Sequence, residues 1–145
     1  MRDLLTKILV KRVLSPVSVA DNTAQVGQVI DRQGYDSATF VILTGSIADA
    51  DATFTVLLEE SDASGSGFSA VADNDMLTQA SGTAPETAAA FQFDDDNEVR
   101  KIGYVGMKRY LRLTITPVNN ASAALLAAAA ILGNPSISPV SQSAS

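Results

Sequence analysis

The chain has 145 residues, enough for one domain, and its 16 acidic and 10 basic residues give a formal net charge of -6. Hydrophobic residues make up 46% of it, which is typical of a globular domain and argues against wholesale disorder. The absence of cysteine and histidine excludes disulfides, Cys/His zinc sites, haem ligation by histidine and every Ser-His or Cys-His nucleophile pair.

The first half of the chain is expected to be extended, because its apolar residues recur with a period of two. Leu4–Leu14 suits an extended arm at least as well as an amphipathic helix, and Thr23–Ile30 is expected to be a strand. Thr39–Gly45 has the β-branched, apolar pattern of a buried strand. The polar turn Ala48–Asp51 follows, and Thr53–Glu60 then predicts the returning strand of a hairpin.

The middle of the chain adds shorter elements. A short extended segment is expected at Phe68–Val71, after a turn rich in glycine and serine. Residues 72–97 are rich in Ala, Asp and Thr and predict a long excursion with one short strand at Ala90–Phe93. Val99–Val105 and Tyr110–Pro117 predict a second hairpin, because the latter alternates apolar and polar residues cleanly.

Ala123–Leu132 is the ambiguous segment, since alanine favours helix. Turn-forming residues on both sides and the lack of polar positions for a solvated helix face favour a buried strand instead. The tail Asn134–Ser145 is expected to be extended along a surface or mobile. About seven or eight strands without full-length helices between them predict an all-β fold, an antiparallel β-sandwich of which the jelly roll is the commonest eight-stranded form.

Charge is distributed unevenly. Between Gln33 and Val99 there are thirteen acids and no base, whereas residues 100–145 hold five bases and no acid. So small a basic set on an acidic protein argues against a nucleic-acid partner, and regions of opposite sign pair within a fold or across subunit contacts. No membrane partner is expected, because no apolar run approaches the ~20 residues of a bilayer span. Charged residues also interrupt the N-terminal apolar stretch, so no secretory signal is expected.

Three patterns that could carry chemistry are each better explained without it. Asp94–Glu98 resembles a hard-cation ligand cluster, but its spacing matches no calcium loop and a solvated acidic loop is favoured. Glu59 and Glu60 are adjacent in a strand, so they point to opposite faces and cannot flank one glycosidic bond. Gly103–Gly106 lacks the remaining glycines of a phosphate loop. We therefore predict no catalytic residue, metal site, cofactor or enzymatic activity.

Four segments carry a resemblance: Ala24–Phe40, Phe54–Asp62, Arg100–Pro117 and the closing Ala130–Pro135. They are similar to a family of small structural proteins from tailed bacteriophages and prophages, and the similarity spans nearly the whole chain. Some head decoration (cement) proteins of phages have jelly-roll folds. The resemblance therefore implies a virion structural protein, made in the bacterial host cytoplasm, that binds the outer surface of the capsid and stabilises it.

The same resemblance implies the major capsid protein as partner and self-association into trimers or dimers on the particle. The expected organisation is an N-terminal arm (1–14), a β-sandwich domain (15–135) and a C-terminal tail (136–145). The candidate interface residues are apolar ones of the arm and the C-terminal bases, namely Leu4, Leu5, Ile8, Val10, Arg100, Lys101, Lys108, Arg109 and Arg112.

Three alternatives stay open. The basic residues could merely balance Asp94–Glu98 within one subunit. The protein could be a head-completion, tail or fibre-associated component of the same particle, which has identical sequence needs. From a different class, a ligand- or carbohydrate-binding sandwich is disfavoured by the 6% aromatic content and the absence of tryptophan.

Overall fold

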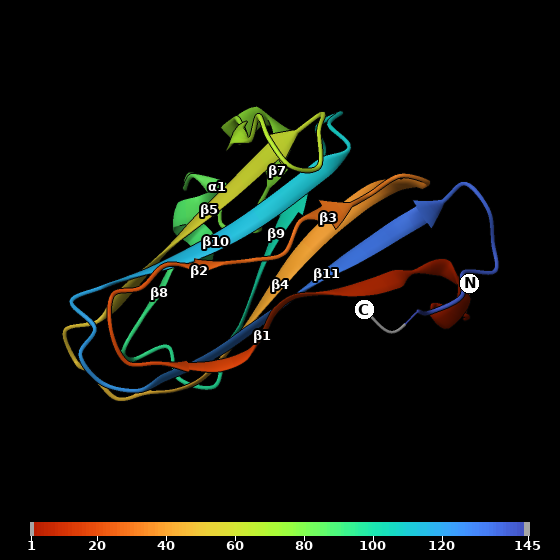
Figure 1. The fold of residues 1–145 in the computed structure, drawn as a ribbon. Helices are drawn as coiled ribbons and strands as arrows, with labels where there is room; N and C mark the ends of the chain where they lie inside the picture. Colours follow the sequence, from red (N-terminus) through yellow and green to blue (C-terminus); the bar gives the residue numbers. More distant parts are fainter. Residues whose placement is uncertain (1, 144–145) are drawn as a thin grey trace.

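The protein, seen in a computed structural model that describes residues 2–143, is a sandwich of two antiparallel sheets (Figure 1). Sheet A runs in the order Leu9–Val19 (β1), Ala124–Pro135 (β11), Tyr35–Ile47 (β4), Val99–Tyr104 (β9), Met76–Leu77 (β7). Sheet B runs in the order Gln25–Val26 (β2), Tyr110–Val118 (β10), Thr53–Ser61 (β5), Ser69–Ala70 (β6), with Ile30–Asp31 (β3) on β10 and Phe91–Gln92 (β8) on β5. The short helices are Leu5–Lys7 (η1), Asp73–Asp75 (η2) and Pro85–Ala89 (α1). None of the helices within residues 2–143 has the length and apolar character needed to cross a bilayer.

The strands pair in a nested order. The first long strand pairs with the last, β1 with β11, and inside that pair lie β2 with β10, β4 with β9 and β5 with β6. Contacts of β11 with β4 and of β10 with β5 join these pairs into the two sheets. This nesting is the jelly-roll arrangement, so the predicted antiparallel β-sandwich is confirmed.

The core lies between the sheets and consists mainly of aliphatic side chains. Burial along β11 alternates strictly: Leu126, Ala128, Ala130 and Leu132 are buried, and the residues between them face outward. Ala123–Leu132 is therefore a strand with alanine on its inner face, where neighbouring strands require small volumes. Its residues pair on both sides, with β1 and with β4.

Both predicted hairpins are wrong. β4 belongs to sheet A and β5 to sheet B, and β9 and β10 are divided in the same way. The connecting loops carry the chain across the sandwich, whose sheets lie about 10 Å apart. The alternation of apolar and polar residues specifies which side chains face the core. It does not specify whether a strand pairs with the preceding strand in one sheet or lies opposite to it in the other sheet.

The boundary expected between an N-terminal arm and the sandwich has to be moved. Residues 9–14 form the first half of β1, and Leu9, Val13 and Leu14 are buried in the core. Val13 and Leu14 both point inward because the register of β1 against β11 shifts between Arg12 and Leu14. Within the expected arm, residues 2–8 alone lie outside the sheet, and Met1 lies outside the described residues.

The C-terminal tail lies along the free edge of β1. The side-chain amide of Gln142 accepts a hydrogen bond from the Val10 N–H (3.1 Å) and donates one to the Val10 carbonyl (2.7 Å). Farther along the same edge, the side-chain amide of Gln28 donates to the carbonyl of Arg12. Val140 packs against the core. The tail therefore lies along a surface, one of the two courses expected for it, as far as residue 143, with bends at residues 136–139. Ala144 and Ser145 lie outside the described residues.

The expected strand Thr23–Ile30 is divided into β2 and β3, and Gly27 between them lies against both sheets: its N–H donates to the Leu113 carbonyl of β10, and the next N–H donates to the Val13 carbonyl of β1. A Cβ at this position would lie 2.6 Å from the Val13 Cγ1 and 2.7 Å from the Leu113 carbonyl oxygen. We expect Gly27→Ala to lower the free energy of unfolding by about 1–3 kcal/mol, since neither neighbour can withdraw cheaply. Urea denaturation measures this loss. Gly65→Ala is the control, because nothing lies within 4 Å of its Cβ position, and an equal effect of both substitutions would contradict the prediction.

Candidate partner interface

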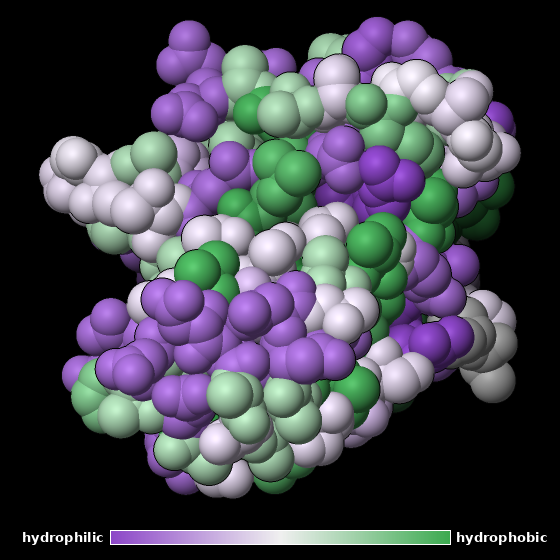
Figure 2. All heavy atoms as spheres, turned by 60° about the vertical axis from the view of Figure 1, so that its left-hand side comes forward, coloured by the Kyte–Doolittle hydropathy of each residue, from purple (hydrophilic) through white to green (hydrophobic). Residues whose placement is uncertain are grey.

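The apolar residues predicted for a partner interface lie at or near one end of the sandwich. Leu4 precedes η1 and Leu5 begins it, and they are 60% and 82% exposed. Ile8 follows η1 and is half-buried, whereas Val10 lies on the outer side of β1 opposite Ile131. On the face drawn in Figure 2, hydrophilic residues separate the exposed hydrophobic ones into several patches.

Two further apolar side chains are exposed at the same end. Met107, in the loop between β9 and β10, is 90% exposed, and Ile137, in the tail, is 81% exposed. A hollow of about 310 Å³ is lined by Gly34, Met107 and Ser136, so the β9–β10 loop and the tail lie close together. The set is termed the terminal surface and comprises Leu4, Leu5, Ile8, Met107 and Ile137.

Arg32 holds the β9–β10 loop in place. Its guanidinium donates hydrogen bonds to the carbonyls of Lys108 (2.5 Å) and Gly106 (3.0 Å) in the loop, and to that of Tyr35 (3.2 Å) at the start of β4. Three charge-assisted bonds from one planar group to backbone on both sides fix the loop to the β3–β4 turn. Met107 is therefore exposed on a rigid support.

Tyr104 supports the loop from within. Its hydroxyl accepts a hydrogen bond from the Lys108 N–H (2.9 Å) and donates one to the carboxylate of Glu60. Burial, and next the hydrogen bond to Glu60, raise the pKa of Tyr104 well above its ordinary value. The hydroxyl therefore stays protonated and keeps both contacts over the whole physiological pH range.

The two predicted basic residues of this loop are already paired within the chain. Lys108 forms an ion pair with Asp62, and Arg109 donates two hydrogen bonds, of 2.9 and 2.8 Å, to the carboxylate of Asp31. The hydrogen bonds from Arg109 hold the pKa of Asp31 below its usual value. Because these pairs are substantially exposed, solvent screens them and they contribute little to stability. They form a polar rim beside the terminal surface.

Arg112 and Lys101 lie on opposite faces of the sandwich. Arg112 pairs with Glu59 at 2.9 Å on the outer face of sheet B. Lys101 lies on the outer face of sheet A, in register with Val41, and none of the ion pairs found within residues 2–143 involves it. The structure thus does not gather the predicted basic residues into one docking face, and their role in docking stays a prediction.

Arg100 binds the acidic loop Asp94–Glu98, as the alternative of charge balance within one subunit requires. Its guanidinium lies 2.7 Å from Asp95 and 3.0 Å from Glu98. The carboxylate of Asp96 accepts the Ile47 N–H at 3.0 Å, and the second oxygen of Asp95 accepts a backbone N–H at 2.8 Å. Most carboxylates of this loop therefore serve its own fold, and no cluster of metal-ligating side chains is found among residues 2–143.

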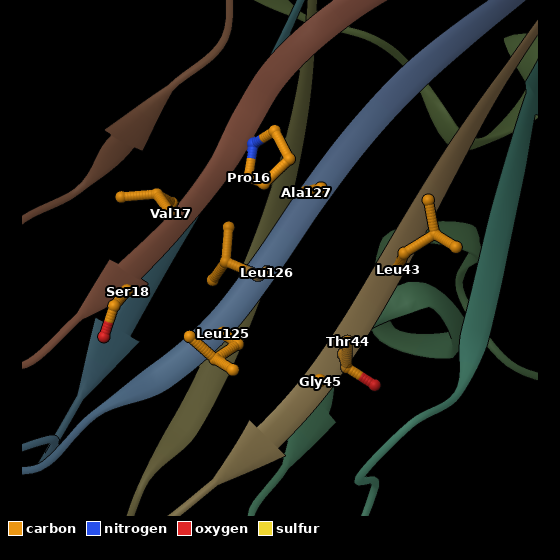
Figure 3. Close-up of a pocket in the computed structure, with 9 residues that line it drawn as sticks. All are labelled: Pro16, Val17, Ser18, Leu43, Thr44, Gly45, Leu125, Leu126 and Ala127. Carbon is orange, nitrogen blue, oxygen red and sulfur yellow. The ribbon is translucent and has the colours of Figure 1, made fainter.

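A shallow groove of about 340 Å³ crosses the outer face of sheet A (Figure 3). It is lined by three segments of neighbouring strands, Pro16–Ser18 of β1, Leu125–Ala127 of β11 and Leu43–Gly45 of β4. Leu43 and Leu125 are each 45% exposed. The sequence carried a signal for this surface that the prediction missed: residues 124–132 of β11 include no polar residue on either face, a pattern of strands covered on both sides.

Arginine side chains of the same chain lie over three aromatic rings, those of the buried Tyr104 and of the half-buried Tyr110 and Phe68. Guanidinium carbons lie 5.3 Å from the ring centre of Tyr104, 4.9 Å from that of Tyr110 and 4.3 Å from that of Phe68. Phe54 and Phe91 stack on each other at 4.7 Å inside the core. A ring covered in this way cannot stack on a sugar, whereas Phe93 is 41% exposed, so the aromatic residues leave the carbohydrate-binding alternative open.

Comparison with known proteins adds information on the fold. No protein-family model and no curated protein matches the chain. Among solved structures, the PBSX exported protein XepA is similar to it with 14% identity and a TM-score of 0.55, over 94% of this chain and 40% of that one. The Yersinia pseudotuberculosis-derived mitogen is similar over 89% of this chain and 88% of its own, with 10% identity and a TM-score of 0.45. The CBM22-1–GH10 modules of Clostridium thermocellum xylanase 10B give 9% identity and a TM-score of 0.45, over 94% and 28%.

At these identities the likeness is one of fold. The similarity to XepA agrees with the β-sandwich seen here, and this chain spans 40% of that protein's length.

Proposed function

We propose that this chain is a non-enzymatic structural protein of a phage particle, a capsid decoration protein that binds the outer surface of the head through the terminal surface. The observation that carries the proposal is the group of exposed apolar side chains at one end of the sandwich, above all Leu5, Ile137 and Met107, the last of which is held on a rigid loop. The phage origin is supported by the sequence resemblance, and a prophage exported protein with a similar fold is consistent with it.

The terminal surface has the composition of a protein-binding site. Its centre is apolar, and the ion pairs Lys108–Asp62 and Arg109–Asp31 stand beside it as a polar rim. Fully burying a leucine, isoleucine or methionine side chain contributes roughly 1.5–3 kcal/mol. Several such side chains offset the cost of immobilising one copy on a shell.

The experiment is cosedimentation of the purified chain with heads of the parent phage that lack it. The double variant Leu5→Asp with Met107→Asp is expected to lower occupancy at least about tenfold, because two charges replace the apolar centre. Val118→Asp is the matched control: its side chain is 42% exposed at the far end of β10, and its substitution is expected to leave occupancy unchanged.

Full occupancy by the double variant would overturn the terminal surface as the docking site. Counting copies in purified particles by quantitative mass spectrometry tests the role itself. Hundreds of copies agree with decoration of the head, whereas about a dozen or fewer assign the protein to a tail or head-completion component. Particles that carry none of it would overturn the virion role.

A further inference from the structure

Four residues on the outer face of sheet A form a square, with the two large ones on one diagonal and the two small ones on the other. Each side of the square that runs across the strands is called a row and joins neighbouring residues on β11 and β4. Leu43 is in register with Ala127, so one row across the strands reads small on β11 and large on β4. In the next row Leu125 lies beside Gly45, where a Cβ would come within 2.8 Å of the Leu125 Cβ. That row therefore reads large on β11 and small on β4 (Figure 3).

We infer that a second copy of this chain covers this face. A two-fold axis that runs across the strands between the two rows exchanges them. It places Leu125 of each copy opposite Ala127 of the other, in the groove beside Pro16, and Leu43 opposite Gly45. The surface is thus complementary to itself in size, which is what an isologous interface requires.

Charge selects this axis over a two-fold axis parallel to the strands. Lys101 is in register with Val41, one row from Leu43, and the carboxylate of Asp96 is bound to the N–H of Ile47, about one row beyond Gly45 on the other side. The axis across the strands exchanges the row of Lys101 with the row near Asp96, so it brings Lys101 of each copy near Asp96 of the other. The parallel axis would instead set Lys101 over Arg12, because Arg12, Ala129 and Val41 share one row, and like charges would meet.

The size of the face sets the strength of the dimer. Four strands about 4.8 Å apart and four rows about 6.7 Å apart cover roughly 500 Å². Stable interfaces usually bury about 800 Å² on each partner. The copies therefore associate reversibly, and the dimer forms at high rather than at low concentration.

Sedimentation equilibrium of the full chain from about 1 μM to about 1 mM tests this directly. We expect a concentration-dependent dimer whose dissociation constant rises at least about tenfold in Leu125→Glu and about three- to tenfold in Lys101→Glu. Leu57→Glu is the control, because Leu57 is exposed to a similar degree on the outer face of sheet B. Equal urea midpoints of the variants and the native chain exclude misfolding, and Lys101→Glu keeps a charge at an already exposed site.

The axis is tested by carbodiimide cross-linking in a mixture of unlabelled and isotopically labelled chains. A peptide that joins Lys101 of one copy to residues 94–98 of the other is expected. A dimer without that cross-link, a dimer indifferent to Leu125→Glu, or a chain that stays monomeric at every concentration would each overturn the inference. A monomer whose Leu125→Glu variant no longer binds phage heads would also overturn it and assign the face to another partner.

Discussion

Replacing Phe40 with alanine is expected to lower the free energy of unfolding by about 3–5 kcal/mol. Phe40 is fully buried at the centre of β4, in register with Ile102 of β9 and Ala130 of β11. Because Ala130 is small and fully buried, no large neighbour from that side can fill the volume that the ring leaves. The cost therefore combines lost burial with a cavity. Chemical denaturation followed by far-UV circular dichroism measures the change.

Leu57→Ala provides the comparison for Phe40→Ala. Leu57 lies on a long strand as well, but it faces outward from sheet B and is 38% exposed. Its truncation is expected to cost about 1 kcal/mol or less. If the two substitutions cost the same, the assignment of Phe40 to the core between the sheets would be wrong.

Deleting residues 1–14 is expected to abolish folding. The deletion removes three buried side chains, Leu9, Val13 and Leu14, and five of the eight registered pairs between β1 and β11. Each buried leucine alone is worth about 2–5 kcal/mol, and a domain of this kind has a total stability of about 5–15 kcal/mol. We expect a chain without cooperative unfolding and without the circular dichroism of a β-sheet.

A shorter deletion distinguishes the contribution of β1 to folding from that of the residues before it. Removing residues 1–4 leaves β1 in place and takes away only exposed hydrogen bonds that η1 donates to Asp3 and Leu4, so the urea midpoint is expected to stay close to that of the full chain. A folded product of the 1–14 deletion would show that β1 is dispensable, contrary to its burial. Loss of folding in the 1–4 deletion would show that the sandwich depends on residues before β1, contrary to the prediction.

The parts of the fold that could be predicted from the sequence are those that alternation determines. Tyr110–Pro117 and Thr53–Glu60 are strands with the predicted inward faces, and the turn residues around Ala123–Leu132 correctly favoured strand over helix. Alternation cannot predict which strands share a sheet, since that depends on whether the loop after each strand stays within one sheet or crosses to the other. The nested pairing of β1 with β11 joins residues more than a hundred positions apart, and nothing local encodes it.

The short helix α1 was missed for a related reason. Five residues are too few to be helical on their own, and α1 exists because Pro85 and Ala89 are buried against the rest of the fold. The carboxylate of Glu86 accepts the N–H of Leu58 at 2.6 Å. Burial raises the pKa of Glu86. A tertiary contact of this kind leaves no pattern in the sequence.

Three residues of the terminal surface, Leu4, Leu5 and Ile8, are among those predicted from the sequence for a partner interface. The exposure of Leu4 and Leu5 could be anticipated, because they lie outside the periodic part of their segment. Met107 and Ile137 could not, since isolated apolar residues in loops carry no periodicity. The sequence also could not show that Lys108 and Arg109 are paired, because Asp62 and Asp31 are distant along the chain.

The amide of Gln142 has a consequence for how the sheet ends. A side-chain amide offers the same donor and acceptor as a peptide group, so it satisfies Val10 as a neighbouring strand would. A strand that did this would present a new row of free backbone groups on its other side, whereas a side chain presents none. Sheet A therefore terminates at β1 rather than offering a template for another chain. At this position, contact between crowded copies therefore cannot extend sheet A from one chain into the next.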